Sequence, residues 1–437
     1  MNKRIIRLTV TAVLLAFSVL SAHAQQTVAP PRFAVTVLTD RPSALYHVGE
    51  KATFNIGVKD GSQPVQDKSV TYALSLDGVG DLGRGKLDLK DGKASASGSL
   101  DKPGILRCTV VFAPDPKDRA VALAGAAFDP EKIEPTAVMP SDFDEFWKVQ
   151  KAALAKIPMD AQLVPVKQPN DKIEVFQITL ANVNKSRVHG VFARPKGPGP
   201  FPAILTVPGA GVRVIGPGEV TGHAASGFLA MSISVHDIPN DRPPDFYPKL
   251  KDGELKDYRA RGREDRMTYY FYRVFLGCVR SVDYLTSLPK WDRKHMIVNG
   301  SSQGGALSLV TAGLDPRITA LAANVPAMCD HSGRDFGRPS GWPQLAPMGK
   351  DGKLDPKVLA VSAYYDAVNF AKKFNGPAIV GVGLIDNVCP ATTVYAAYNV
   401  LRGPKRMDIA PLMGHAQSKS YIALKERWIL ERAGLKK

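Results

Sequence analysis

One short segment, Gly-Ser-Ser-Gln-Gly-Gly at residues 300–305, strongly restricts its own backbone. An apolar run, His295–Asn299, precedes it, and a helix-forming run, Ala306–Val310, follows it. A G-x-S-x-G sequence between a strand and a helix is typical of a sharp turn that holds its serine at an exposed apex. The glycines around the serine leave room for neighbouring backbone to approach. The segment therefore predicts a strand–turn–helix unit with Ser302 as a candidate nucleophile.

The chain after Val164 alternates strand-like and helix-like segments, which is typical of a mostly parallel sheet with helices on both faces. The strand-like segments are Val188–Ala193, Ala203–Val207, Phe228–Val235, Met296–Asn299, Ile318–Val325, Ala378–Leu384 and Met407–Leu412, and the helix-like ones are Val274–Leu288, Gln303–Leu314 and a stretch from Glu426. The sequence therefore predicts the α/β fold class for residues 141–437.

The earlier part of the chain has a different pattern. From Phe33 to about Ala126, short runs alternate apolar and polar residues, and turn clusters such as Lys59-Asp-Gly-Ser separate them. Such strands without helical periodicity predict an immunoglobulin-like β-sandwich at residues 25–128, followed by a linker at 129–140. The role of this domain stays open between a carbohydrate-binding accessory and a packing domain.

The first 24 residues predict export from the cytoplasm. Three basic residues precede an apolar run, Leu8–Leu20, and Ala22-His23-Ala24 fits the small-x-small cleavage pattern. The run is shorter than the roughly 20 residues that span a bilayer. We therefore expect a removed signal peptide at 1–24, no membrane anchor, and a periplasmic or secreted protein.

The net charge of +16 fits two interpretations: a basic surface that favours acidic substrates such as uronate-bearing polysaccharides, or simply a soluble exported protein with a basic bias, which is the preferred one. The Lys and Arg residues are scattered without a long basic run, so we expect no nucleic-acid partner. Cys108, Cys278, Cys329 and Cys389 lack the spacing of metal ligands. In an oxidising compartment they are either paired in disulfides or buried as free thiols, and the sequence leaves both open.

A serine nucleophile needs a base and an acid that orients the base. In enzymes with this type of turn the acid follows the serine and the histidine comes last. Only His331 and His415 follow Ser302. His415 comes directly after a strand-like segment, whereas His331 comes too early to follow the acid. Asp386 also directly follows a strand and is preferred to Asp366, which lies on a helix-like stretch. We predict a Ser302–Asp386–His415 triad.

An oxyanion hole requires two N–H donors near the nucleophile. The first expected donor is the backbone N–H of Gln303, the residue after the serine. The second is expected in the glycine-bounded loop Val207–Val212 after a strand, where Ala210 is the chosen donor.

Four segments together resemble the acetyl xylan esterase and cephalosporin-C deacetylase family, carbohydrate esterase family 7. They are Asp142–Trp147, Gly300–Gly305, Gly383–Asp386 and Gly414-His415, and Tyr395–Asn399 is also similar to the helix that follows the family's acid. The resemblance covers roughly Ser141 to the C-terminus. It implies an α/β-hydrolase fold, deacetylation of small acetylated carbohydrates, and no metal or organic cofactor.

Two positions depart from the family pattern. Ser234–Pro239 stands where the family has Arg-Gly-Gln, and His415-Ala416 stands where it has His-Glu. The β domain is an addition to the family pattern, so the ring-like oligomer of the family is not assumed for this chain and its oligomeric state stays open.

Polar loops are expected around the site, with His236 as a substrate-binding residue. Trp342 is either a stacking surface for a pyranose ring or a core residue.

These observations predict a serine esterase that removes acetyl groups from xylan-type polysaccharides or oligosaccharides through an acyl-enzyme on Ser302. One alternative is an esterase or peptidase of the same fold that acts on another acyl group, because a fold alone does not fix the chemistry. Another is an inactive carbohydrate-binding protein, against which the complete triad argues. Since the triad and both oxyanion donors follow the linker, hydrolysis is expected to survive removal of the β domain up to about Lys132.

Overall fold

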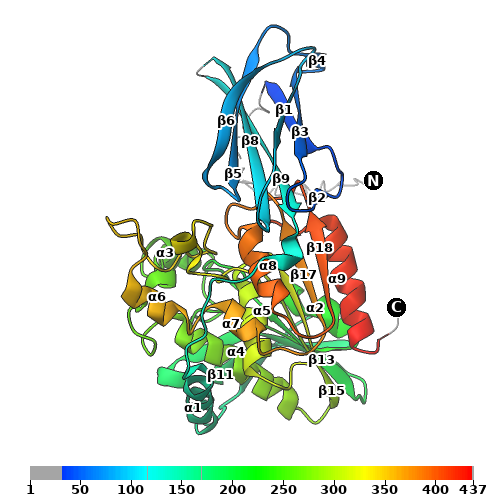
Figure 1. The fold of residues 1–437 in the computed structure, drawn as a ribbon. Helices are drawn as coiled ribbons and strands as arrows, with labels where there is room; N and C mark the ends of the chain where they lie inside the picture. Colours follow the sequence, from blue (N-terminus) through cyan, green and yellow to red (C-terminus); the bar gives the residue numbers. More distant parts are fainter. Residues whose placement is uncertain (1–31, 116, 169, 436–437) are drawn as a thin grey trace, which may run out of the picture.

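The computed structural model describes residues 32–115, 117–168 and 170–435. The predicted signal peptide at 1–24 lies outside the described residues, so it stays a prediction. Two parts are visible in Figure 1, a β region at residues 33–128 and an α/β region at residues 143–435. The β region stands on the α/β region beside β17, β18 and α8, which are Ala378–Gly383, Lys405–Ala410 and Ala391–Asn399.

The β region consists of two sheets around one core. The first sheet contains β1 (Phe33–Thr39), β3 (Ala52–Asp60), β4 (Gln63–Pro64) and β7 (Lys93–Gly98), and the second has the order β2 (Leu45–Tyr46), β9 (Asp118–Phe128), β8 (Gly104–Asp115), β5 (Ser69–Leu76) and β6 (Val79–Asp88). Alternate residues of β3, such as Phe54 and Ile56, share a buried cluster with Leu106 and Val110 of β8. Side chains of a strand alternate between its two faces, which explains the period-two pattern of the sequence.

The α/β region is built on one nine-stranded sheet. Its order is β10 (Gln162–Val166), β11 (Ile173–Ala181), β12 (Arg187–Pro195), β14 (Leu229–Ile233), β13 (Phe201–Val207), β15 (Trp291–Ser301), β16 (Ala320–Asn324), β17 and β18. The pairs from β14 to β18 are parallel, and those from β10 to β14 are antiparallel. The sheet is therefore mixed and mostly parallel.

Helices cover both faces of this sheet (Figure 1). The helices α1 (Phe143–Ala155), α4 (Phe271–Ser287), α5 (Gln303–Leu314), α7 (Ala367–Ala371) and α8 share one buried cluster, and α2 (Gly218–Ala225) and α9 (Lys419–Arg432) share the other. The shorter helices are α3 (Phe246–Asp252), α6 (Pro356–Ser362), η1 (Pro130–Lys132), η2 (Val183–Lys185), η3 (Tyr258–Ala260) and η4 (Gly333–Phe336). On β13, Leu205 joins the first cluster and Ile204 the second. Burial on both faces explains the unbroken apolar run of this strand.

The structure decides between the two alternatives for the cysteines. Cys108, Cys278, Cys329 and Cys389 are all buried free thiols.

Within the described ranges, no helix has the length and apolar character needed to cross a bilayer.

Candidate active site

Ser302 lies at the turn between β15 and α5, with φ 60° and ψ −122°. A positive φ is uncommon for a residue with a side chain and stores backbone strain that surrounding contacts must hold. Its N–H donates to the Asn324 carbonyl at 2.9 Å. Its carbonyl accepts from the N–H groups of Ala306 and Ala327 at 3.1 and 3.0 Å. These bonds to β16 and α5 fix the turn that presents the Ser302 hydroxyl.

The glycines of the turn allow this close packing. A Cβ atom on Gly300 would lie 2.7 Å from the Val207 carbonyl oxygen, and one on Gly304 would lie even closer to the same atom. A Cβ atom on Gly305 would lie 2.8 Å from the Asn324 carbonyl oxygen. Any side chain at these positions would push β13 or β16 away from the turn.

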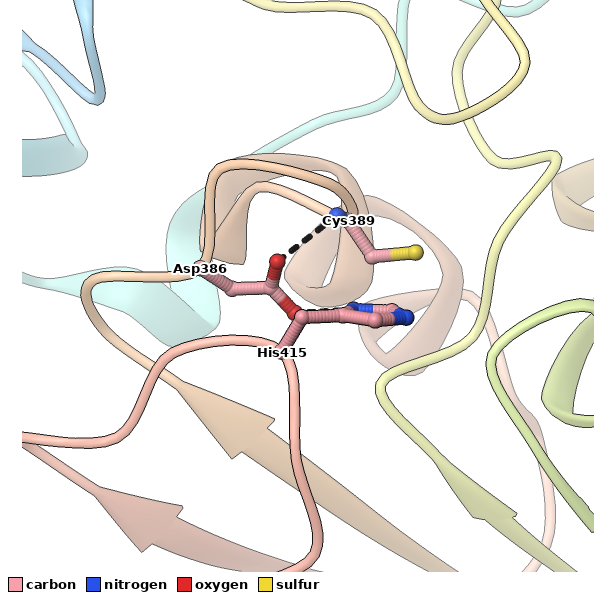
Figure 2. Close-up of side chains that lie close together, drawn as sticks. All are labelled: Asp386, Cys389 and His415. Atoms are coloured by element: carbon pink, nitrogen blue, oxygen red, sulfur yellow. Dashed lines mark hydrogen bonds and ion pairs between the residues drawn. The ribbon is translucent and has the colours of Figure 1, made fainter. Parts of the chain in front are cut away.

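The three residues of the predicted triad form one hydrogen-bonded chain. His415 Nε2 lies 2.8 Å from Ser302 Oγ, and His415 Nδ1 lies 2.8 Å from Asp386 Oδ2. Because an ionised carboxylate only accepts, Nδ1–H donates to Asp386 and Nε2 is left to accept from the serine hydroxyl. The Asp386 side chain is fully buried, whereas that of His415 is 27% exposed. The acid and base come from loops after the neighbouring strands β17 and β18 (Figure 2).

Further hydrogen bonds hold the acid and the base in place. Asp386 Oδ1 accepts from the N–H groups of Val388 and Cys389 at 2.7 and 2.9 Å. The buried Asn324 side chain donates to Ser301 Oγ at 2.9 Å and to the Ala416 carbonyl at 3.2 Å. Asn324 thus connects the serine turn to the histidine loop. The sequence reasoning missed it, and its only signal is an amide side chain at the end of an apolar strand.

The two predicted oxyanion donors border the same turn. Ala210 is exposed in the loop after β13, and a Cβ atom on the neighbouring Gly209 would lie 3.4 Å from the Ser301 carbonyl oxygen. This loop therefore runs directly over the serine turn. Within the described part of the chain, the backbone N–H groups of Gln303 and Ala210 donate to no protein acceptor. Both remain available for the roles that the sequence predicts.

The Gln303 side chain is buried behind this loop. Its Oε1 accepts from the Tyr258 hydroxyl at 2.6 Å, and its Nε2 lies 3.5 Å from the Pro208 carbonyl. Tyr258 is buried and belongs to η3, far from the turn in sequence. It is a second residue that the sequence reasoning missed.

His236, which the sequence predicts as a substrate-binding residue, is buried in the structure. The residue is only 1% exposed, and Tyr258 and Tyr270 enclose its ring. Its Nδ1 lies 2.6 Å from the Tyr270 hydroxyl, and its Nε2 lies 3.1 Å from the Gly211 carbonyl. Both ring nitrogens are therefore used inside the protein. His236 supports the loop that carries Ala210, and it has no free nitrogen for a sugar hydroxyl.

The burial of His236 predicts a pH effect on stability. Desolvation lowers the pKa of His236 to about 4, despite the hydrogen bond to Gly211 that opposes the shift. An unfolded histidine titrates near ~6.5, so between these pH values the unfolded chain binds more protons and stability falls as the pH falls. His236→Gln keeps one donor and one acceptor but cannot titrate. We expect its stability deficit relative to wild type, measured by urea unfolding, to be smaller at pH 4.5 than at pH 7. An equal deficit at both pH values would contradict the prediction.

Trp342 lies half-buried in the long loop between β16 and α6 and packs partly against the core. Its carbonyl accepts from the Met328 N–H at 2.6 Å. This backbone bond fixes the position of the loop. Sugar stacking on the Trp342 ring stays a prediction.

Asp386, Cys389 and His415 offer ligand atoms within 4.8 Å of one another (Figure 2). Burial raises the pKa of the Cys389 thiol well above its ordinary value, so the neutral thiol is favoured beside Asp386. The Asp386 carboxylate already accepts two backbone N–H groups and the imidazole. The carboxylate and the imidazole of this group are thus both engaged in the hydrogen-bonded chain to Ser302.

The mixed sheet with its serine turn defines an α/β-hydrolase-like fold. The solved structure of an acetyl xylan esterase from Paenibacillus sp. R4 matches with a TM-score of 0.60 and 27% identity, over 69% of this chain and 98% of that one. Acetyl xylan esterase 1 from Thermoanaerobacterium sp. JW/SL YS485 has the same fold, with a TM-score of 0.58 and 23% identity over 69% and 97% of the two chains.

The family model of acetyl xylan esterase (AXE1) matches residues 130–431. Acetyl esterase Axe7A of Xylanibacter ruminicola is 35% identical over 384 residues, which cover 85% of this chain and 84% of that protein. The chain therefore belongs to the acetyl xylan esterase family of carboxylic ester hydrolases, as its four sequence segments predict. A match of this length extends beyond residues 130–437 into the β region.

Proposed function

We propose that this protein removes acetyl groups from acetylated carbohydrates, such as xylan-type polysaccharides or oligosaccharides, through an acyl-enzyme on Ser302. The observation that carries the proposal is the hydrogen-bonded chain from the Ser302 hydroxyl through His415 to the buried Asp386. The names of the similar proteins, acetyl xylan esterases and an acetyl esterase, support the choice of acyl group and substrate.

The reaction would begin with proton transfer from Ser302 Oγ to His415 Nε2 as Oγ attacks the acetyl carbonyl carbon. The N–H groups of Gln303 and Ala210 then stabilise the negative oxygen of the tetrahedral intermediate. When the ester C–O bond breaks, His415 gives the proton to the departing sugar oxygen, which leaves as a hydroxyl, and the acetyl group stays on Ser302. Asp386 stabilises the imidazolium that forms in each step.

Water completes the cycle. His415 takes a proton from a water molecule, whose oxygen attacks the acetyl-serine carbonyl, and the same N–H donors stabilise the second oxyanion. Collapse of this intermediate returns the proton to Ser302 and releases acetate. Every proton is carried by His415, so these residues supply the complete acid–base chemistry of the reaction.

The position of the protein in the cell follows from its first residues. We infer that it acts in the periplasm or outside the cell, because residues 1–24 have the three parts of a signal peptide. N-terminal sequencing of the exported protein should begin at Gln25. We also infer that the β region is an immunoglobulin-like sandwich, which its two sheets around a shared core support.

The proposal predicts that acetyl esters react faster than longer ones. Polar loops, Val235–Pro244 and Asp330–Pro339, are expected to border the site, and their side chains favour contact with sugar hydroxyls over contact with a long acyl chain. Each methylene that a pocket accepts or rejects changes the barrier by about 1–3 kcal/mol, so kcat/KM should fall by roughly tenfold or more from acetate to octanoate. The measurement uses para-nitrophenyl acetate, butyrate and octanoate. Octanoate hydrolysis as fast as acetate hydrolysis would overturn the deacetylase proposal.

A second assay tests the carbohydrate part. Acetylated xylan, other acetylated polysaccharides and short acetylated oligosaccharides are incubated with enzyme, and free acetate is measured. We expect acetate release from at least the xylan-type substrates. Hydrolysis of the chromogenic ester without release from any glycan would leave an acetyl esterase whose substrate is not a carbohydrate.

A further inference from the structure

An arginine of the β region reaches the loop that carries Asp386. Arg107 lies on β8, and its side chain is only 3% exposed. Its Nη2 donates to the backbone carbonyl of Asp386 at 2.9 Å. Its Nη1 donates to the side-chain oxygen of Asn387. One guanidinium from the β region therefore binds two consecutive residues of the acid loop.

A buried aspartate of the β region extends this contact. Asp77 is fully buried and forms an ion pair with Arg107 through Oδ1. Its Oδ2 accepts from the backbone N–H of Thr392, at the start of α8, at 2.8 Å. The ion pair thus binds the acid loop at Asp386 and Asn387 and again at Thr392, where the loop ends in α8. Burying two charges costs much of what their attraction returns, so such a pair is better suited to fixing geometry than to adding stability.

The backbone of the β region touches the same loop. Gly125 of β9 lies opposite Arg107 in the β8–β9 pairing. A Cβ atom on Gly125 would lie 2.6 Å from the carbonyl oxygen of Leu384 and 2.8 Å from its Cβ. Leu384 precedes Asp386 by two residues. The facing positions of β8 and β9 therefore form one surface against the acid loop.

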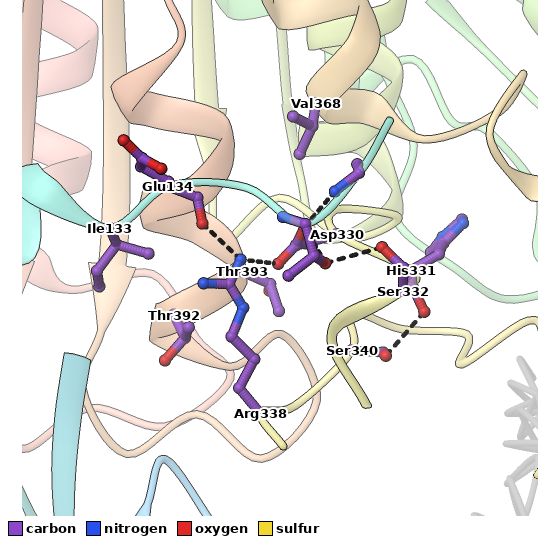
Figure 3. Close-up of polar contacts among 12 residues, drawn as sticks. Ile133, Glu134, Asp330, His331, Ser332, Arg338, Ser340, Val368, Thr392 and Thr393 are labelled. Carbon is purple, nitrogen blue, oxygen red and sulfur yellow. Dashed lines mark hydrogen bonds and ion pairs between the residues drawn. The ribbon is translucent and has the colours of Figure 1, made fainter. Parts of the chain in front are cut away.

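The segment between the two regions is also hydrogen-bonded to the α/β region. Fully buried Asp330 accepts from the Thr136 and Ala137 N–H groups at 2.6 and 3.0 Å. Arg338 donates to the same aspartate and, at 2.6 Å, to the Glu134 carbonyl (Figure 3). The segment between the two regions is thus bonded along the α/β region rather than free.

We propose that Arg107 is a positioning residue for Asp386, so that the β region forms part of the catalytic apparatus. The bond to the Asp386 carbonyl fixes the turn whose Val388 and Cys389 N–H groups hold the carboxylate oxygen Oδ1. The other oxygen, Oδ2, then meets His415 Nδ1 in the geometry that orients the base. The proposal rests on the proposed function of Asp386 as the acid.

This proposal reverses one expectation from the sequence. Removal of the β domain up to about Lys132 would expose the Leu384 contact and leave the Asp386 carbonyl without its donor. The truncated enzyme should therefore lose activity even with an intact Ser302–Asp386–His415 sequence.

A double variant tests the role of Arg107 without leaving a buried charge unpaired. Asp77→Asn keeps an acceptor for Thr392, and Arg107→Met fills the space of the arginine stem. Replacing both partners of a buried ion pair with neutral residues often costs little stability. Misplacing a reacting group by about 1 Å can cost roughly 100-fold in rate. We expect kcat on para-nitrophenyl acetate to fall about 10- to 100-fold, with KM almost unchanged and Tm close to that of wild type.

The matched control is the double variant Asp81→Asn/Arg84→Met. Asp81 and Arg84 also form an ion pair in the β region, but on the exposed surface. This control should keep the wild-type kcat. Two further readouts report the triad itself, namely the rate at which a fluorophosphonate labels Ser302 and the low-field proton resonance of the His415 Nδ1–H bond. Both should weaken in Asp77→Asn/Arg107→Met and stay unchanged in the control.

The outcomes separate this proposal from the proposed function. A folded Asp77→Asn/Arg107→Met variant with wild-type kcat would overturn the role of Arg107, even if Ser302→Ala is inactive. Activity in Ser302→Ala would instead overturn the acyl-enzyme proposal. If the double variant does not fold, Arg107→Lys keeps a positive charge beside Asp77 but lacks the planar fork that reaches Asp77, the Asp386 carbonyl and Asn387 together, and it should lower kcat about tenfold or more. An unchanged kcat in a folded Arg107→Lys variant would then overturn the proposal.

Discussion

Ser302→Ala should remove nearly all esterase activity while Tm stays close to that of wild type. In the proposed reaction, Ser302 Oγ is the atom that forms the covalent bond to the acetyl group. The residue is half-buried, and the hydrogen bonds that hold its turn come from its backbone N–H and carbonyl rather than from its side chain. Loss of a serine nucleophile in a triad costs about a million-fold in kcat, leaving the residual effect of the oxyanion donors and binding. The measurement is kcat on para-nitrophenyl acetate together with thermal unfolding.

The neighbouring serine supplies the control. Ser301 precedes the nucleophile, and its Oγ accepts from Asn324 rather than from the base. Ser301→Ala should keep most of the activity. A Ser302→Ala enzyme with more than about a tenth of the wild-type rate, or loss of activity only in Ser301→Ala, would show that the wrong serine had been assigned.

His415→Ala should be about as damaging as Ser302→Ala. Its Nε2 is the only protein base in hydrogen-bond contact with Ser302 Oγ among the described residues. Asp386→Asn should cost somewhat less, about 10,000-fold, because an amide that donates to Nδ1 favours the wrong imidazole tautomer. His331→Ala is the control. His331 is buried, and its ring nitrogens form no hydrogen bond with Ser302, Asp386 or His415. Severe loss in His331→Ala with mild loss in His415→Ala would mean that the base is wrong.

Helices and strands with a long apolar run could be predicted from the sequence. The predicted helix Gln303–Leu314 has the same bounds as α5, and the predicted strand Ala378–Leu384 differs from β17 by one residue. Both elements are buried on nearly all sides, so their apolar runs are continuous. β10 was not predicted, because its residues Gln162–Val166 are mostly exposed and their pattern shows no buried face. Its pairing with β11 depends on the neighbouring strand rather than on its own sequence.

The residues of the candidate site also fall into those that the sequence predicted and those that it did not. Ser302, Asp386 and His415 each follow a strand, and parallel strands bring such loops to one edge of the sheet. The roles of Tyr258 and Arg107 depend on approaches between distant segments, since Arg107 and Asp386 lie 279 residues apart. The one signal for Arg107 is a charged residue within the apolar strand Ile105–Phe112. The burial of the His236 ring could not be predicted for a related reason, because Tyr258 and Tyr270 from another segment pack against it.

The contact between Gly125 and Leu384 restricts how new enzymes can be made by exchanging parts of related chains. A chimera that joins this α/β region to another N-terminal domain keeps the acid loop but loses the glycine and the ion pair that fit against it. Successful exchange would therefore require the facing positions of β8 and β9 to be transferred together with the acid loop. The two facing surfaces, rather than either region alone, are then the parts that such a design should transfer.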